Sequence, residues 1–152
     1  MIKGEKNKRI IVGFLLISSL GKIDAQSLNE DYSLRTDTVF NSVVSVNLPL
    51  GYKQIKTFYD EGVFIDYYYT DGSILTLFAG ALHKTPLLSL NPKYNIQAVD
   101  TIGARISYKG NVGRKKWRED AIGNLHIYYD NVPIEKEQVF NRVLESIVIK
   151  KI

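Results

Sequence analysis

The residues best suited to chemistry in this sequence are Glu119 and His126, whose side chains can act as an acid and a base. Both lie in strand-like segments, and Gly123-Asn124 between them is typical of a tight hairpin turn. Pairing the two segments across this turn places Glu119 opposite Tyr128 and diagonal to His126, within reach of a long side chain. The face that carries them comprises Trp117, Glu119, Ala121, His126, Tyr128 and Asp130.

The Glu119 and His126 pair has a catalytic and a structural interpretation. If its face packs inward, burial shifts both pKa values, as in a general acid/base pair. In the structural interpretation Glu119 hydrogen-bonds the hydroxyl groups of buried tyrosines, or both groups lie at the rim of the sheet. We favour the structural interpretation, because the sequence shows no positioned nucleophile or cofactor site to accompany the pair.

The opposite face of the same sheet is predicted to be basic. It carries Arg105, Ser107, Lys109, Lys116, Arg118 and Asp120 beside Ile127 and Tyr129. A basic strip with an exposed tyrosine can bind an acidic protein surface or an anionic polymer. The alternative, which we favour, is the solvated face of a half-buried antiparallel sheet whose edges are protected by Lys and Arg.

Tyrosine occurs ten times in the chain, three times in succession at 67–69. Strand alternation places Tyr67 and Tyr69 in the core and Tyr68 on the surface, beside Phe64 and Asp66. A tyrosine ring offers rigid contact area with one polar tip, so Tyr68 is a candidate binding residue.

No metal or cofactor site is predicted. The two histidines, His83 and His126, are far apart in sequence, and neither has a second ligand at the spacing of a zinc site. The glycines lack the Lys-Ser/Thr of a phosphate loop, and no Gly-x-Ser-x-Gly motif occurs. The chain has no cysteine, which excludes disulfides, lipobox acylation and thiolate chemistry.

The strongest hairpin signal lies at Asp71-Gly72, where segments 63–70 and 73–79 flank a predicted type I′ turn. Both faces of this hairpin are nearly equally apolar, which predicts a covering layer on each side. The pairing groups Val63, Ile65, Tyr67 and Tyr69 with Ile74, Thr76 and Phe78 on one face.

The remaining elements complete a layered domain. Alternation predicts a strand at 44–48 and a meander over 104–130, whereas 82–102 is expected to be a long loop. After Pro133, apolar residues at helical spacing predict a helix that ends near Ser146, followed by a short strand. We therefore predict an α+β fold, with an antiparallel sheet of about six strands covered by helix, including the C-terminal helix, in a layered sandwich.

The first 25 residues have the pattern of a secretory signal peptide. A basic start precedes an apolar run at 10–20 that is too short to span a bilayer, and a cut is expected between Ala25 and Gln26. Residues 1–25 are thus predicted to be the signal peptide, 26–37 a flexible arm and 38–152 a single domain. Removal of the basic leader leaves a nearly neutral chain, without the positive excess of a nucleic-acid-binding protein.

Three short patterns resemble the PsbP-like α/β/α sandwich domains: SVNLPLGY at 45–52, WRE at 117–119 and FNRVLESIVI at 140–149. In that family a strand leads into a Pro-Gly turn, and a final helix with a Phe-x-x-x-Leu-x-Ser pattern precedes the last strand. Tyr52 stands where the family usually has tryptophan. The resemblance implies a module that binds proteins or assists assembly, with no catalytic motif to carry over.

These patterns predict an exported protein, periplasmic or secreted, that is a non-catalytic binding or assembly module for another envelope protein. No nucleic-acid partner, cofactor or stable membrane insertion after leader removal is expected. The alternative is a small-ligand carrier or hydrolase with a pocket near Trp117, Glu119, His126 and Tyr128. The candidate binding residues are Tyr68, Trp117, Glu119, His126, Tyr128, Arg105 and Arg118.

Overall fold

The structure, a computed structural model, describes residues 31–39, 42–81 and 86–152. The predicted signal peptide, the start of the predicted arm and His83 lie outside the described residues. The described strands are β1 (Tyr32–Val39), β2 (Ser42–Pro49), β3 (Tyr52–Tyr59), β4 (Gly62–Tyr69), β5 (Ile74–Gly80), β6 (Ala98–Ile102), β7 (Arg105–Val112), β8 (Lys115–Ile122), β9 (Leu125–Pro133) and β10 (Val148–Lys151). The helices are α1 (Glu137–Glu145) and the short 3₁₀ turns η1 (Leu88–Leu90) and η2 (Ile134–Lys136).

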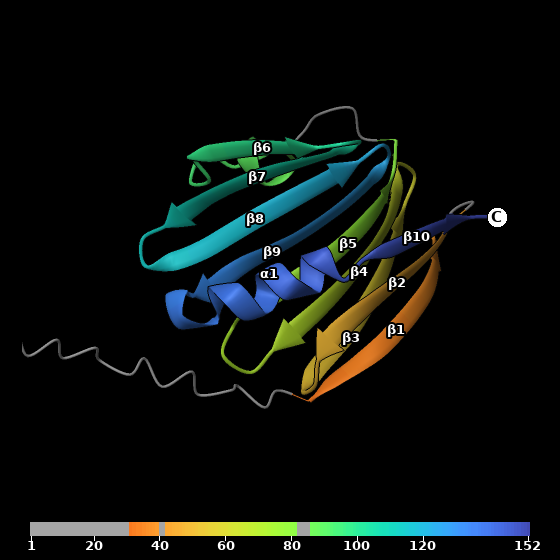
Figure 1. Cartoon of the computed structure of the whole chain (residues 1–152), viewed down its shortest axis with the longest axis horizontal. Helices are drawn as coiled ribbons and strands as arrows, with labels where there is room; N and C mark the ends of the chain where they lie inside the picture. Colours follow the sequence, from red (N-terminus) through yellow and green to blue (C-terminus); the bar gives the residue numbers. More distant parts are fainter. Residues whose placement is uncertain (1–30, 40–41, 82–85) are drawn as a thin grey trace, which may run out of the picture.

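The strands form two antiparallel sheets (Figure 1). The larger has seven strands in the order β3-β4-β5-β9-β8-β7-β6, and the smaller has three in the order β1-β2-β10. Helix α1 and the smaller sheet lie on the same side of the larger sheet (Figure 1). We call this side of the seven-stranded sheet its inner face and the opposite side its outer face.

The predicted α+β class is wrong, because the protein is mostly β. Of the described residues 63% lie in strands and 13% in helices. The layer that was expected to be helical is built largely from β1, β2 and β10, and α1 is the one α-helix of the described chain. The C-terminal helix and the strand after it are observed where the sequence predicted them.

The main core lies between the inner face and this mixed layer. Strands β4, β5 and β9 contribute alternate residues, such as Ile65, Leu77 and Ile127, and α1 contributes Phe140 and Leu144. The helix buries these residues because they lie one turn apart on a single stripe. Its end is fixed by Ser146, whose Oγ donates to Val143 O (2.7 Å) and accepts from Asn47 N–H (3.0 Å).

Three successive hairpins of the larger sheet use two-residue loops that begin with Gly103, Gly113 and Gly123. Each glycine has φ of +59°, a left-handed conformation that costs glycine little. Such short loops fix the register, so the facing pairs of β8 and β9 follow directly from the turn. The Glu119 and Tyr128 pair is found where the sequence predicted it.

The register at Asp71-Gly72 differs from the prediction by one residue. Tyr69 N–H donates to Ser73 O (3.0 Å) and Gly72 N–H to Tyr69 O (3.1 Å), which closes a three-residue loop. Asp71 does not have positive φ, so the turn is not type I′; Gly72 alone takes the left-handed conformation, at +84°. Leu75 therefore faces Tyr67 and Leu77 faces Ile65. The core face of β5 consequently carries Leu75, Leu77 and Ala79 rather than Ile74, Thr76 and Phe78.

Replacing Gly72 with valine is expected to lower the free energy of unfolding by about 1 kcal/mol or more, since a β-branched residue is strained at this φ. Thr70→Val in the same loop is the matched control, because Thr70 is exposed and lacks the left-handed conformation. Chemical denaturation measures both. Equal stability of the two variants would contradict the loop conformation described above.

Two segments have more structure than their sequences indicate. Residues 32–37, part of the predicted flexible arm, lie in β1, and residues 98–102 of the predicted long loop form β6. Residues 86–97, which we call the covering segment, run between β5 and β6 and lie against the outer face. The covering segment contacts Trp117 and Glu119 of β8 and Asp130 of β9, so it covers the neighbouring part of the sheet and not the predicted hairpin.

Candidate functional site

The centre of the outer face is a buried pair formed by Glu119 and His126. Glu119 Oε1 lies 2.9 Å from His126 Nδ1, and the two residues are 0% and 1% exposed. Alternation along β8 and β9 brings both side chains to the outer face, since Glu119 faces Tyr128 and Ala121 faces His126. The semi-buried pair expected from the sequence is therefore fully enclosed.

The Glu119 carboxylate also holds the covering segment. Its Oε1 accepts a hydrogen bond from Leu87 N–H (2.7 Å) and its Oε2 one from Leu88 N–H (3.0 Å). These donors lie at the start of η1, where backbone N–H groups have no partner within the helix. With His126, Glu119 therefore has three hydrogen-bonding contacts within the protein, and its side chain is fully buried.

Trp117 and Tyr94 pack against each other on the outer face and connect the sheet to the covering segment. Their rings meet edge to face with centroids 5.8 Å apart, and both side chains are buried. Tyr94 donates its hydroxyl proton to Asp130 Oδ2, and burial together with this bond raises the pKa of Tyr94. A Cβ at Gly110 would collide with the Asn95 carbonyl oxygen and with the Trp117 ring, so only glycine fits beneath these groups. Trp117 is therefore a packing residue between the sheet and the covering segment.

Tyr128 on β9 lies between Glu119 of β8 and Thr76 of β5. It faces Thr76 on β5, and burial raises the pKa of its hydroxyl group. Thr76 donates to Asp66 Oδ1 (2.6 Å), so the polar groups here satisfy one another. A tyrosine with a raised pKa stays protonated at neutral pH and cannot act as a base there.

A row of aromatic rings joins the buried pair to the edge of the sheet. The centroid distances are 5.8 Å from His126 to Phe78, 4.4 Å from Phe78 to Phe64 and 5.6 Å from Phe64 to Tyr59. The row begins beneath the covering segment and ends on the exposed strand β3. The covered and uncovered halves of the outer face are thus continuous.

We call the uncovered half the outer patch, defined by Ile55, Tyr59, Phe64 and Tyr68. Alternation on the paired strands β3 and β4 brings all four residues to the outer face. Ile55, Tyr59 and Tyr68 are 41%, 59% and 38% exposed, and Phe64 is half-buried. Tyr68 thus emerges on the surface, as the sequence predicted, whereas Tyr67 is buried and Tyr69 packs against the core.

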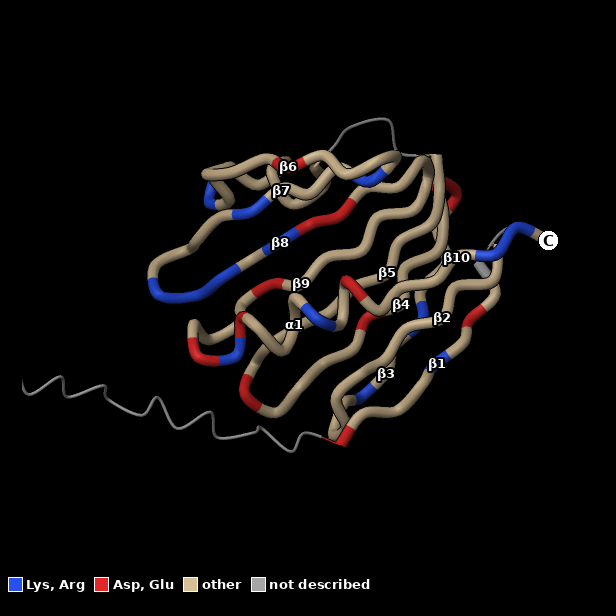
Figure 2. Tube along the Cα trace, in the orientation of Figure 1, with Lys and Arg blue, Asp and Glu red and all other residues tan. Residues whose placement is uncertain are grey.

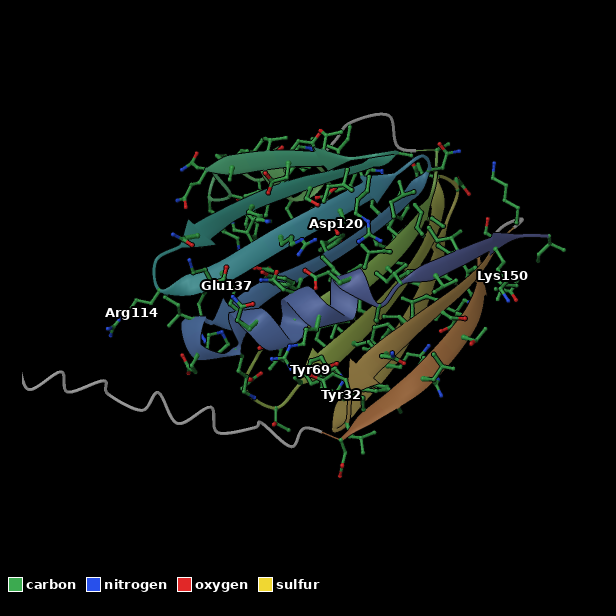
Figure 3. All side chains as sticks on the ribbon, in the orientation of Figure 1. Tyr32, Tyr69, Arg114, Asp120, Glu137 and Lys150 are labelled. Atoms are coloured by element: carbon green, nitrogen blue, oxygen red, sulfur yellow. The ribbon has the colours of Figure 1, made fainter. Side chains whose placement is uncertain are left out.

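Arg105 and Arg118 lie on the inner face, away from the other predicted site residues. Arg118 is buried and forms a bidentate pair with Asp120, with Nε–Oδ1 and Nη2–Oδ2 distances of 2.8 and 2.9 Å. Burial alone would lower the pKa of Arg118, but Asp120 outweighs it and raises this pKa. Arg105 donates to Leu144 O (3.3 Å) and lies 3.5 Å from the Asp120 carboxylate. Figure 3 shows Asp120 on β8 beside the helix.

The predicted basic strip is thus largely an anchor for α1. Arg118 Nη1 and the Tyr129 hydroxyl both donate to Asn141 Oδ1, each at 3.1 Å, and Tyr129 is buried rather than exposed. Figure 2 shows charged residues following β7, β8 and the turn between them, where basic residues predominate. Arg118 and Asp120 are buried in this group, so the strip is not the solvated face that we favoured from the sequence.

Two functional features are not visible in the sequence. The backbone donors Leu87 and Leu88 lie far from Glu119 in the chain and have no side-chain signature. A cavity of about 770 Å³ opens between the two sheets, and neither Glu119 nor His126 lines it. The sequence placed a possible pocket on the outer face, whereas this cavity lies on the inner side.

Within the described residues, no cluster of three or more His, Cys, Asp or Glu side chains is arranged to hold a metal ion. The same part of the chain contains no helix with the length and apolar character needed to cross a membrane.

Comparison with protein-family models, curated proteins and solved structures finds no match. The likeness to PsbP-like domains therefore stays a prediction.

Proposed function

We propose that this chain is an exported, non-catalytic binding module that recognises another envelope protein through the outer patch. The observation that carries the proposal is the exposure of Ile55, Tyr59 and Tyr68 together on one half of a sheet whose other half is covered. Aromatic side chains are enriched at protein interfaces, where they supply contact area at low entropic cost. The leader-like start of the sequence supports export.

The geometry of the outer patch suits a protein partner. Tyr59 packs edge to face against Phe64, and Phe64 packs against the buried Phe78, so the exposed Tyr59 ring is supported by the core of the sheet. Preorganised aromatic anchors of this kind lose little freedom on binding. Lys53 and Asp66, on the same face, supply charges of both signs beside the apolar centre. This mixed surface favours a folded protein over an anionic polymer.

The buried pair supports a non-catalytic role. Glu119 accepts from two backbone N–H groups and contacts His126, and neither side chain reaches solvent. A general base must lie within hydrogen-bond reach of a proton on its substrate, and this carboxylate is surrounded by the protein's own donors. Glu119 therefore supports the structure that presents the outer patch.

Site-specific photo-cross-linking in the native host tests the proposal. A photoreactive phenylalanine derivative at position 68 is expected to give a discrete cross-linked product with one envelope protein, identifiable by mass spectrometry. The control position is Ile134, which is exposed and lies in η2, outside the outer patch. The same product in equal yield from position 134, or none from positions 59 and 68, would contradict the proposed surface.

A further inference from the structure

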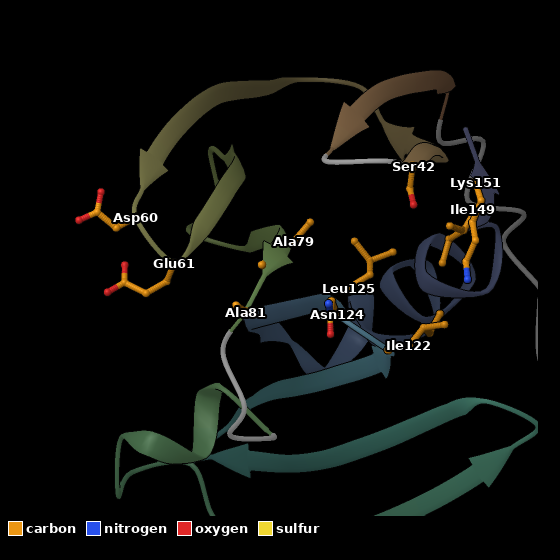
Figure 4. A pocket seen from close by; sticks show the side chains of 12 residues that line it. Ser42, Asp60, Glu61, Ala79, Ala81, Ile122, Asn124, Leu125, Ile149 and Lys151 are labelled. Carbon is orange, nitrogen blue, oxygen red and sulfur yellow. The ribbon is translucent and has the colours of Figure 1, made fainter.

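The cavity between the two sheets is a second surface with the properties of a binding site. It lies at one end of the sandwich, bounded by the β3–β4 and β8–β9 turns, the end of β5 and strand β10 (Figure 4). Its volume of about 770 Å³ falls within the rough 300–1,000 Å³ range of small-molecule sites.

One part of the cavity wall is aliphatic, and the rest is formed by glycines, Ser42, Asn124 and the charged residues Asp60, Glu61 and Lys151. Ala79 and Leu125, which belong to the main core, lie on one side, and Ile149 of β10 lies on another. Figure 4 shows Leu125, Ile122 and Ile149 facing the same space. No aromatic side chain is among its described lining residues. The aliphatic part of the wall fits a flexible hydrocarbon chain. A planar aromatic ligand would find no aromatic side chain to stack on among these residues.

Lys151 supplies one positive charge at the edge of the cavity, and Asp60 and Glu61 supply two negative charges. Lys151 follows Ile149 by two residues on β10, so both side chains are on the same face of the strand. In Figure 4 the Lys151 side chain extends beside Ile149, whereas the carboxylates of Asp60 and Glu61 point away from the cavity. No ion pair involves Lys151 among the described residues. An anionic group at the end of an aliphatic ligand would complement it.

We propose that this cavity binds an aliphatic monocarboxylate, with the hydrocarbon chain between the sheets and the carboxylate paired with Lys151. This site is on the inner side of the larger sheet and is independent of the outer patch. The ligand class follows from the lining: the aliphatic residues contact the chain, and Lys151 beside Ile149 pairs with the carboxylate, since the Asp60 and Glu61 carboxylates point away from the cavity.

Titration of the purified full chain with decanoate tests this site by calorimetry, with decanol and decyltrimethylammonium as ligands of matched chain length. Decanoate is expected to bind once per chain. Decanol is expected to bind about fivefold more weakly, because it lacks the charge that pairs with a partly exposed lysine. The cationic ligand is expected to bind more weakly still.

Variants locate the binding. Lys151→Gln is expected to weaken decanoate about fivefold while leaving decanol unchanged, and Lys150→Gln, on the other face of β10, is the matched control with less than a twofold effect. Ser42→Trp, which places a large ring at the cavity wall, is expected to weaken both ligands at least tenfold. Ala81→Trp, at an exposed lining position, serves if Ser42→Trp fails to fold, as judged by thermal unfolding.

Two results would contradict the proposal, one concerning Lys151 and the other concerning the location of the site. Equal effects of Lys151→Gln and Lys150→Gln, or equal affinity for decanoate and decanol, would overturn the assignment of the carboxylate to Lys151. Decanoate binding that persists in the folded tryptophan variants would overturn the site itself.

Discussion

Replacing Glu119 with alanine is expected to lower the free energy of unfolding by about 3–5 kcal/mol, because each buried hydrogen-bonding group left without its partner costs about 1–3 kcal/mol. The substitution leaves Leu87 N–H, Leu88 N–H and His126 without their acceptor in an enclosed site. Amide hydrogen exchange at Leu87 and Leu88 should accelerate more than at the core strands, because the covering segment is released first. Denaturant titration gives the total loss of stability.

Two variants serve as controls for Glu119. Glu61→Ala removes an exposed carboxylate and is expected to change stability by less than about 0.5 kcal/mol. Glu119→Gln keeps the shape but turns an amide donor toward one of the N–H donors, so an intermediate loss of about 1–3 kcal/mol is expected. A folded Glu119→Gln protein that had lost turnover of some substrate would show that the pair is catalytic.

Replacing Phe140 with alanine is expected to cost about 3–5 kcal/mol, the range for truncating a buried aromatic side chain. The Phe140 ring meets the rings of Tyr69 and Tyr129 at centroid distances of 5.3 and 5.7 Å, so its loss leaves a cavity where α1 meets the larger sheet. The measurement is the free energy of unfolding from denaturant titration.

The matched control for Phe140 is Arg142→Ala, on the exposed side of the same helix, with an expected change of less than about 0.5 kcal/mol. If both substitutions were equally mild, α1 would be peripheral. The mixed layer over the inner face would then depend on β1, β2 and β10 alone.

The strands that the sequence did not predict share one physical property. Strands β1, β3 and β6 are all edge strands, and most of their side chains are exposed, including every residue of β6. Alternation arises only where one face of a strand is buried, so these edges leave no periodic signal. Of the three, only β1 belongs to the layer over the inner face, whereas β3 and β6 are the two edges of the larger sheet. The sequence predicted the strands at 44–48 and at the C-terminus, but not that they belong to a second sheet.

The candidate site was predictable where short loops fix the pairing. The two-residue loop at Gly123 sets the register of β8 and β9, and the shared face of Glu119 and His126 follows from it. At Asp71-Gly72 the loop has one more residue than expected, which shifted the predicted partners of β5. The contacts from Leu87 and Leu88 and the cavity depend on packing between distant segments, which periodicity does not encode.

The dissociation constant of the reconstituted complex tests the central claim most directly, namely that the outer patch binds another envelope protein. Once cross-linking has identified the partner, Tyr68→Ala is expected to weaken binding at least tenfold, as for an aromatic anchor near the centre of an interface. Ile134→Ala, which removes an exposed apolar side chain outside the patch, should leave the constant unchanged. An unchanged dissociation constant for folded Tyr68→Ala and Tyr59→Ala proteins would contradict binding through the outer patch.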